Sequence, residues 1–268
     1  MRGNSYHKIG DRLRMNFDEF IATLPSSITR GYHYPLPDNV IKKLFLLADL
    51  GKRDIFYDLG CGDGRSLEIA ATEFGVRKAV GVESNLELAQ AAVERCKKIM
   101  KTRVIKDDLL KVDLSVATIV LVRYADSELT QRTERKLKRE LADGGRVITI
   151  WSPFGLTIPD KIDFPFFVTK KPFCRARSLR DQIKSVYGQR CIDFTAAWLL
   201  AERYIDQLET VKTEYRRFVT ILQSLVIWIN AWKMRVACEE EIPPPVHTYL
   251  GIMKTFFDVD LSNLLDKY

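Results

Sequence analysis

The stretch that decides the fold is Asp58-Leu59-Gly60-Cys61-Gly62-Asp63-Gly64-Arg65, or DLGCGDGR. It follows the apolar, strand-like run Ile55–Leu59 and precedes Arg65–Phe74, whose apolar residues have helical spacing. The three alternating glycines let the backbone turn tightly and approach a ligand where any Cβ would clash. The helix that follows presents its positive N-terminal end to this turn. The stretch therefore predicts a ligand-binding turn between a strand and a helix.

Two carboxylates further along the chain indicate what kind of ligand this is. Glu83 ends a second strand-like run, Ala79–Glu83, and Asp108 closely follows a third, Arg103–Lys106. A carboxylate after the second strand can accept both hydroxyls of a ribose, as in nucleotide-binding sheets. Asp108 can accept a hydrogen bond from an adenine amino group. The Gly-x-Gly-x-Gly spacing led by Asp58 differs from the dinucleotide fingerprint, so the pattern favours another adenosine-containing ligand.

The surrounding chain alternates strand-like and helical runs. Further strands are expected at Ala117–Val122 and Arg146–Trp151, and helices at Leu86–Met100 and Glu128–Leu141. Continuous apolar strands separated by helices are typical of a parallel sheet covered on both faces, so we predict a doubly wound α/β fold. A final antiparallel pair is expected from Phe166–Thr169 and Ile183–Tyr187, joined by a basic loop.

DLGCGDGR, GVES (residues 81–84) and KDDLL (residues 106–110) stand in an order and spacing that resemble the class I S-adenosylmethionine-dependent methyltransferases. The resemblance covers about residues 32–188 and implies a Rossmann-like, seven-stranded sheet. It implies that Asp58 faces the amino group of the methionine part, that Glu83 holds the ribose and that Asp108 holds the adenine. Cys61 is expected to be a small packing residue within the loop. The expected cofactor-binding set is Asp58, Gly60, Cys61, Gly62, Gly64, Glu83 and Asp108.

Two flanking segments resemble the non-SET protein-lysine methyltransferases, which include broad-specificity archaeal-type enzymes and histone-lysine enzymes. They are YPLPDNV (residues 34–40) before the first strand and VRYAD (residues 122–126) after the fourth. The chain departs from that group at Leu36, where Thr or Ser is usual, and at Arg123, where a neutral residue is usual. The resemblance implies methyl transfer to lysine Nε of protein substrates by in-line displacement.

Lysine methylation requires a neutral Nε, and the ordinary pKa of lysine is about 10.4. A desolvated aromatic channel lowers that pKa and aligns the lone pair with the methyl group. Tyr124 is the first candidate for this lining, with Tyr34 and Trp151 beside it, although Tyr124 can equally be an ordinary core aromatic. Asp126 is placed either to attract the lysine ammonium and receive its proton or to cap the following helix.

The net charge of +7 comes from 42 Lys and Arg against 35 Asp and Glu. Nearly all of it lies in Lys170–Arg190, which holds seven basic residues and one acidic residue, Asp181. This basic segment is either a solvated loop or a docking surface for nucleic acid or an acidic protein. An RNA methyltransferase is the first alternative function, but the fourth strand is not followed by an Asn/Asp-Pro-Pro-aromatic motif. A non-catalytic cofactor-binding assembly protein and a small-molecule methyltransferase remain open alternatives.

Three regions are expected: an N-terminal helical segment (1–31), the methyltransferase domain (32–188) and a helical C-terminal appendage (189–268). No Gly or Pro interrupts Gln189–Ile242, which predicts one very long helix or two consecutive helices ended by the prolines at 243–245. The apolar run Phe218–Trp232 is short for a membrane span of about 20 residues. We expect it to be a buried helix, with a dimer seam or a membrane-surface helix as alternatives.

Five cysteines are scattered along the chain and none stands in a Cys-x-x-Cys pair. This pattern favours a reducing compartment and argues against a disulfide framework or a zinc site. The first ten residues also lack the apolar core of a signal peptide. We therefore expect a cytoplasmic protein without a structural metal.

Overall fold

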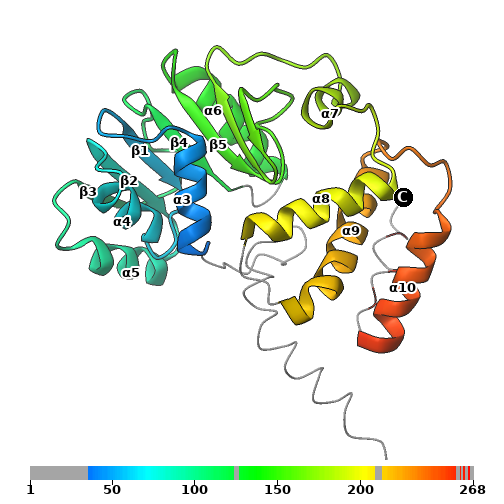
Figure 1. Ribbon diagram of the computed structural model, residues 1–268. Helices are drawn as coiled ribbons and strands as arrows, with labels where there is room; N and C mark the ends of the chain where they lie inside the picture. The colour runs from blue at the N-terminus through cyan, green and yellow to red at the C-terminus, as the bar shows by residue number, and fades with distance from the viewer. Residues whose placement is uncertain are drawn as a thin grey trace, which may run out of the picture. The chain divides into compact units, whose positions relative to one another are not determined.

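The fold is described from a computed structural model, which defines residues 36–123, 127–208 and 213–257, together with Asp260, Ser262 and Leu265. The expected N-terminal helical segment, 1–31, lies outside these residues. The described chain divides into two compact units between Ala176 and Arg177, somewhat before the boundary that the sequence suggested at 188/189. We call the described residues up to Ala176 the sheet unit and those from Arg177 onward the helical unit (Figure 1).

The sheet unit contains a seven-stranded sheet in the order β3-β2-β1-β4-β5-β7-β6. Strands β1 to β5 are parallel, β7 is antiparallel to β5, and β6 is antiparallel to β7. The strands are β1 (Ile55–Leu59), β2 (Lys78–Glu83), β3 (Thr102–Lys106), β4 (Ile119–Val122), β5 (Arg146–Ile150), β6 (Lys161–Asp163) and β7 (Phe166–Lys170). The seven-stranded, doubly wound prediction is confirmed. The strand order changes direction between β1 and β4, and the carboxyl ends of strands at such a point are where ligands bind.

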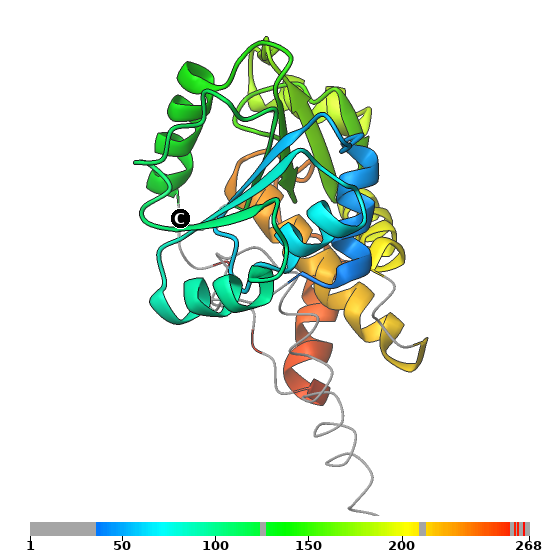
Figure 2. The same cartoon turned by 90° about the vertical axis from the view of Figure 1, so that its left-hand side faces the viewer.

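Helices cover both faces of the sheet (Figure 2). They are α3 (Asp38–Leu47), α4 (Arg65–Thr72), α5 (Leu86–Cys96) and α6 (Ser127–Glu140). On one face, Phe45 of α3 contacts Phe56 of β1 edge to face, with ring centroids 5.0 Å apart. On the other face, Leu137 of α6 shares a buried cluster with Tyr57. Because Phe56 and Tyr57 are consecutive residues of β1, their side chains point to opposite faces, as the alternation of a strand requires.

A buried ion pair fixes α3 at the amino end of the parallel strands. The Asp54 carboxylate accepts hydrogen bonds from the backbone of Gly51 at 2.9 Å, from the Thr118 hydroxyl at 2.8 Å and from Arg146. Arg146 also donates to the carbonyl oxygens of Ala48 and Asp49, just after α3 ends. The loss of one partner would leave a buried charge uncompensated, which is strongly destabilising.

The expected strand at Ile183–Tyr187 is wrong, because these residues end helix α7 (Leu179–Tyr187). The Ser178 hydroxyl accepts the Asp181 backbone N–H at 3.1 Å and thereby caps the start of α7, and Gly188 ends it in a left-handed conformation. The strand that completes the sheet is β6, at its edge. The basic segment therefore does not join two strands, since it begins at the end of β7 and includes α7.

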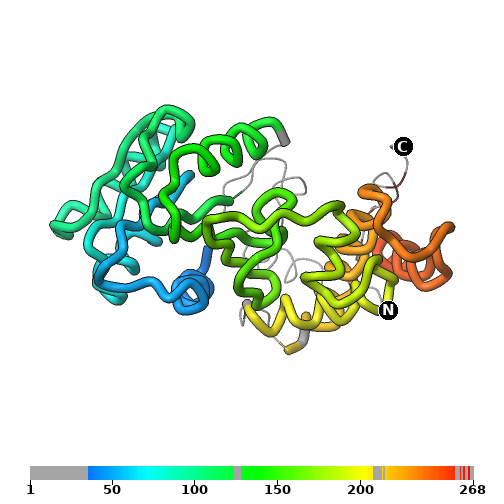
Figure 3. Tube along the Cα trace, turned by 90° about the horizontal axis from the view of Figure 1, so that it is seen from above, coloured from blue at the N-terminus to red at the C-terminus, as the bar shows by residue number. Residues whose placement is uncertain are grey.

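The helical unit continues through α8 (Phe194–Leu208), a short 3₁₀ turn (Thr213–Tyr215), α9 (Arg216–Lys233) and α10 (Pro244–Phe257) (Figure 3). Helix α9 packs against both α8 and α10. The prediction of two consecutive helices is confirmed, but α9 ends at Lys233, before the prolines, and Pro244 begins α10 instead. Most of α9 is buried, including the fully buried Trp228. Within the described ranges, no helix is both long and apolar enough to cross a membrane.

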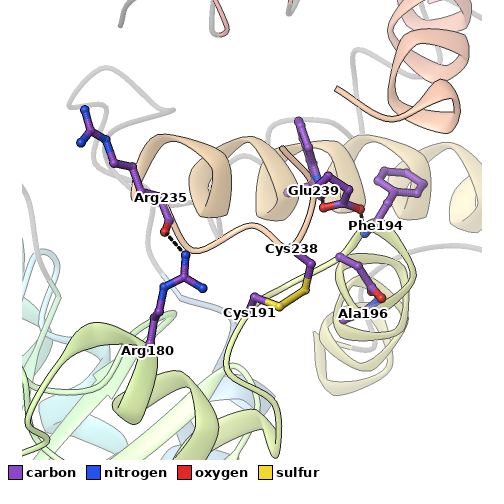
Figure 4. The surroundings of a disulfide bond; sticks show 9 residues. Arg180, Cys191, Phe194, Ala196, Arg235, Cys238 and Glu239 are labelled. Atoms are coloured by element: carbon purple, nitrogen blue, oxygen red, sulfur yellow. Dashed lines mark hydrogen bonds between the residues drawn. A yellow bond between two sulfur atoms is a disulfide. The ribbon is translucent and has the colours of Figure 1, made fainter. Parts of the chain in front are cut away.

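A disulfide bond joins Cys191, just before α8, to Cys238, in the segment after α9 (Figure 4). Glu239 lies next to it and accepts hydrogen bonds from the Phe194 backbone at 3.0 Å and from the Trp228 indole at 2.9 Å. The pairing corrects the expectation that the cysteines form no disulfide. It was not visible in the sequence because the two residues are 47 positions apart. The cytoplasmic location stays a prediction, which the cysteines no longer support.

Reduction of this disulfide should destabilise the helical unit. A cross-link that closes a loop of about 47 residues stabilises a protein by about 4 kcal/mol in the chain-entropy model. We expect thermal unfolding of the Cys191→Ser/Cys238→Ser variant to begin at a lower temperature, and dithiothreitol to shift the wild-type protein in the same direction. Cys174→Ser, which removes an exposed free thiol, is the matched control and should change nothing. If alkylation of the denatured, unreduced protein modifies all five cysteines, the bond does not form.

Candidate functional site

The glycine loop lies between β1 and α4, at the carboxyl edge of the sheet. Gly60, Gly62 and Gly64 all have positive φ angles, of 95°, 55° and 79°. A Cβ on Gly60 would meet nothing within 4 Å, so the space beside this residue is open. A Cβ on Gly64 would lie 2.9 Å from the Cβ of Ala92, because the loop contacts α5 there. Glycine is thus required at these two positions for different reasons: open space at Gly60 and close packing at Gly64.

Asp58 is a buried carboxylate at the start of this loop, with 5% of its surface exposed. One of its oxygens accepts a hydrogen bond from the Ser66 hydroxyl in α4. Burial raises the pKa of Asp58 to about 6, while the hydrogen bond from Ser66 and the positive charge of Arg123 act in the opposite direction. A carboxylate that is costly to bury gains from a bound cation, and this suits the ammonium group that Asp58 is predicted to face.

Glu83 is buried at the end of β2 and holds the glycine loop from the neighbouring strand. Its Oε2 accepts the Gly62 backbone N–H at 2.9 Å, and its Oε1 accepts the Asn85 backbone N–H at 2.8 Å. A carboxylate offers about four lone-pair sites, so each oxygen retains acceptor capacity after these bonds. Glu83 can therefore shape the loop and also accept two ribose hydroxyls.

A network of charged groups between α4 and α5 also fixes the loop, and sequence reasoning missed it. Arg95 of α5 donates to the Asp63 carbonyl at 3.0 Å and to the Asp63 carboxylate at 2.8 Å. Its other nitrogen reaches Glu68 of α4 at 3.0 Å. Arg65 pairs with Asp63 at 3.3 Å and donates to the Leu36 carbonyl. Only the side of α5 that faces the loop reveals this role, and the amphipathic pattern alone did not assign Arg95 to it.

The remaining predicted cofactor residues differ in how they are placed. Asp108 is exposed in the loop after β3, and its Oδ1 accepts the Leu110 backbone N–H at 2.9 Å. It therefore supports a turn, and its contact with adenine stays a prediction. Cys61 is buried against β2, where a Cβ on Gly81 would lie 2.5 Å from the Cys61 sulfur. Burial raises the pKa of Cys61, as expected for a packing residue and not a nucleophile.

The predicted methyl-acceptor residues Tyr34, Tyr124 and Asp126 lie outside the described residues. Trp151 is described, and it follows β5 at the same carboxyl edge as the glycine loop. Its φ angle of 76° lies in the left-handed region, which is uncommon for a bulky residue. The indole contacts Phe164 edge to face, with centroids 6.0 Å apart. Such local strain often marks functional sites, so Trp151 remains a candidate for the acceptor side.

The described residues fit S-adenosylmethionine. Asp58 is placed for an ammonium group, Glu83 for the ribose hydroxyls, and the open space beside Gly60 allows a ligand to approach the backbone. All three lie at the carboxyl edge where the strand order reverses.

Comparisons with known proteins match this part of the chain. A family model described as the ANTKMT methyltransferase domain matches residues 58–161. Over 120 residues the chain is 36% identical to a protein-lysine N-methyltransferase of Saccharolobus islandicus (strain REY15A), a match that covers 44% of this chain and 74% of that protein. Over 127 residues it is 35% identical to a Xenopus laevis lysine N-methyltransferase named for an ATP synthase subunit, and this match covers 46% and 53% of the two chains.

Similarity also extends to solved structures. One is an RNA methyltransferase from Salinibacter ruber in complex with S-adenosyl-L-homocysteine, which is 28% identical to this chain. The match covers 54% of this chain and 98% of that one, with a TM-score of 0.49.

Proposed function

The chain belongs to the family of protein-lysine N-methyltransferases, and from that premise we propose that it transfers a methyl group from S-adenosylmethionine to lysine Nε of protein substrates. One observation carries the proposal: the family match begins at Asp58 and includes the glycine loop, Glu83 and Asp108. The similarity thus falls on the residues that build the candidate site. The helical unit lies outside that match, so it offers no support for a particular substrate.

The chain's own residues have a limited set of tasks in this reaction. S-adenosylmethionine supplies the electrophilic methyl group. Asp58 and Glu83 orient the bound cofactor, and the Asp63–Arg95 pair holds the loop between them. On the acceptor side, the proposed lining of Tyr124, Tyr34 and Trp151 excludes water and favours a neutral lysine Nε. Asp126 is proposed to attract the lysine ammonium and to receive its proton through water.

The RNA methyltransferase alternative rests on the basic segment, and the contacts of two of its residues weaken it. The Lys171 ammonium donates to the carbonyl oxygens of Lys138 and Leu141 at the end of α6, at 2.8 and 2.5 Å. Arg180 donates to the Arg235 carbonyl at 2.9 Å. Both cations therefore stabilise the fold. We propose proteins as the substrates and do not favour nucleic acid. A cytoplasmic location and oligomerisation through the C-terminal helices remain parts of the proposal.

Transfer of label from methyl-labelled S-adenosylmethionine tests the acceptor. We expect the purified protein to label bulk protein but not bulk RNA, and hydrolysis of the labelled protein to release methyllysine. The same bulk protein with its lysines acetylated should accept no label, because acetylation removes the nucleophilic amine. The Asp58→Asn variant serves as the inactive control. Label only in RNA would overturn the lysine proposal, and no transfer to either acceptor would favour a non-catalytic cofactor-binding protein.

A further inference from the structure

Arg123 is the residue at which this chain departs from its relatives' usual neutral side chain, and the sheet places it beside Asp58. Strand β4 pairs with β1 in parallel register, with Leu121 opposite Asp58 and Val122 opposite Leu59. Arg123 directly follows Val122, so it lies at the carboxyl edge beside the first residue of the glycine loop. The position is at the point where the strand order reverses.

Acidic groups surround Arg123 at this edge. The side chain is partly buried, and its charge interacts with those of Asp58, Glu83 and Asp63. Burial lowers the pKa of Arg123, while these three carboxylates oppose the shift. A guanidinium stays protonated in proteins, so Arg123 brings a permanent positive charge into the site. Arg65 and Arg95 also lie near the loop, but both pair with Asp63.

The methionine part of S-adenosylmethionine carries two opposite charges on one carbon, an ammonium and a carboxylate. Asp58 suits the ammonium. The carboxylate would then enter a site that already holds the negative charges of Asp58 and Glu83, and like charges at close range disfavour binding. A guanidinium beside Asp58 removes this conflict, because its fork of N–H groups matches the two oxygens of a carboxylate.

We propose that Arg123 binds the α-carboxylate of the cofactor's methionine group while Asp58 binds the α-ammonium, so that the two residues together recognise the zwitterion. This inference rests on the cofactor site of the proposed function. It assigns to Arg123 a binding role that the resemblance to the lysine methyltransferases does not supply.

The test compares two ligands that differ only in this carboxylate: S-adenosylmethionine and decarboxylated S-adenosylmethionine. Calorimetry of the wild-type protein and of Arg123→Gln gives four affinities. A charge-assisted hydrogen bond contributes a factor of about 10 to 100. We therefore expect Arg123→Gln to weaken S-adenosylmethionine binding by about that factor and to leave the affinity for the decarboxylated ligand nearly unchanged. Arg123→Lys, which keeps the charge, should recover part of the lost affinity.

Each other outcome overturns the proposal. Equal weakening of both ligands would show that Arg123 acts only on the structure of the site, and unchanged affinity for both would show no role in binding. Tighter binding of S-adenosylmethionine by Arg123→Gln would show that Arg123 competes with the ammonium for Asp58. Thermal unfolding establishes that each variant is folded. If the wild-type protein binds neither ligand, the cofactor assignment of the proposed function fails as well, which separates the two failures.

Discussion

The Asp58→Asn variant is expected to unfold at a higher temperature than the wild-type protein at pH 8 and to lose its affinity for the cofactor. The pKa of Asp58 is about 6 in the folded protein, against an ordinary value of 3.8. Because the folded state binds this proton more tightly than the unfolded state, the wild-type protein loses stability as the pH rises from below 4 through 6. Above that range the cost reaches about 3 kcal/mol. An amide carries no charge and avoids this cost, yet it can still accept the hydrogen bond from Ser66.

The loss of affinity follows from the same change. Removal of one partner of a buried charge pair costs about 2 to 5 kcal/mol in binding, which corresponds to about 100-fold or more in affinity. Calorimetry with S-adenosylmethionine measures this loss, and thermal unfolding at pH 4 and pH 8 measures the change in stability. The difference in stability between variant and wild type should be present at pH 8 and nearly absent at pH 4.

Asp54→Asn is the matched control, because Asp54 is also a buried carboxylate but lies at the opposite edge of the sheet, paired with Arg146. This variant should lose stability at pH 8 and keep its cofactor affinity at temperatures where it is folded. If Asp58→Asn is instead less stable at pH 8 and binds the cofactor normally, Asp58 is a structural residue like Asp54.

The sequence was sufficient to predict the parts of the site that depend on local pattern. The turn after β1 and the carboxylate that ends β2 follow from short-range spacing, because a buried parallel strand and a glycine turn need only their own residues to be recognised. Both Asp58 and Glu83 are buried at the predicted edge. Their roles toward the cofactor came from the family resemblance, since local pattern gives the position of a carboxylate but not its ligand.

The features that escaped prediction depend on pairing between distant segments. All three residues of β6 are exposed, so β6 has no apolar pattern and becomes a strand only through its partner β7. The basic residues around Ser178 obscured the helix start that its hydroxyl caps in α7. The roles of Arg95 and Arg123 became visible only when the packing of α5 and the register of β4 placed their charges beside the loop. No local pattern specifies such contacts.

Three glycine-to-alanine variants separate the two demands on the glycine loop. Gly60, Gly64 and Gly144 all have positive φ angles, so each alanine carries a similar backbone strain of about 1 to 2 kcal/mol. Gly144 lies between α6 and β5, away from the site, and a Cβ there would meet nothing within 4 Å. Gly144→Ala is therefore the control for backbone strain alone.

Gly64→Ala should be the least stable of the three, by about 2 to 3 kcal/mol beyond the control, because its Cβ would lie 2.9 Å from the Cβ and 3.0 Å from the Cα of Ala92. The backbone of α5 cannot yield as a flexible side chain can. Gly60→Ala should match Gly144→Ala in chemical unfolding, yet bind S-adenosylmethionine about 10-fold or more weakly, because its new methyl group occupies the space that the ligand enters. Equal cofactor affinity in Gly60→Ala and Gly144→Ala would mean that the ligand does not approach Gly60. Equal stability of Gly64→Ala and Gly144→Ala would mean that α5 does not hold the loop as closely as the contact with Ala92 requires.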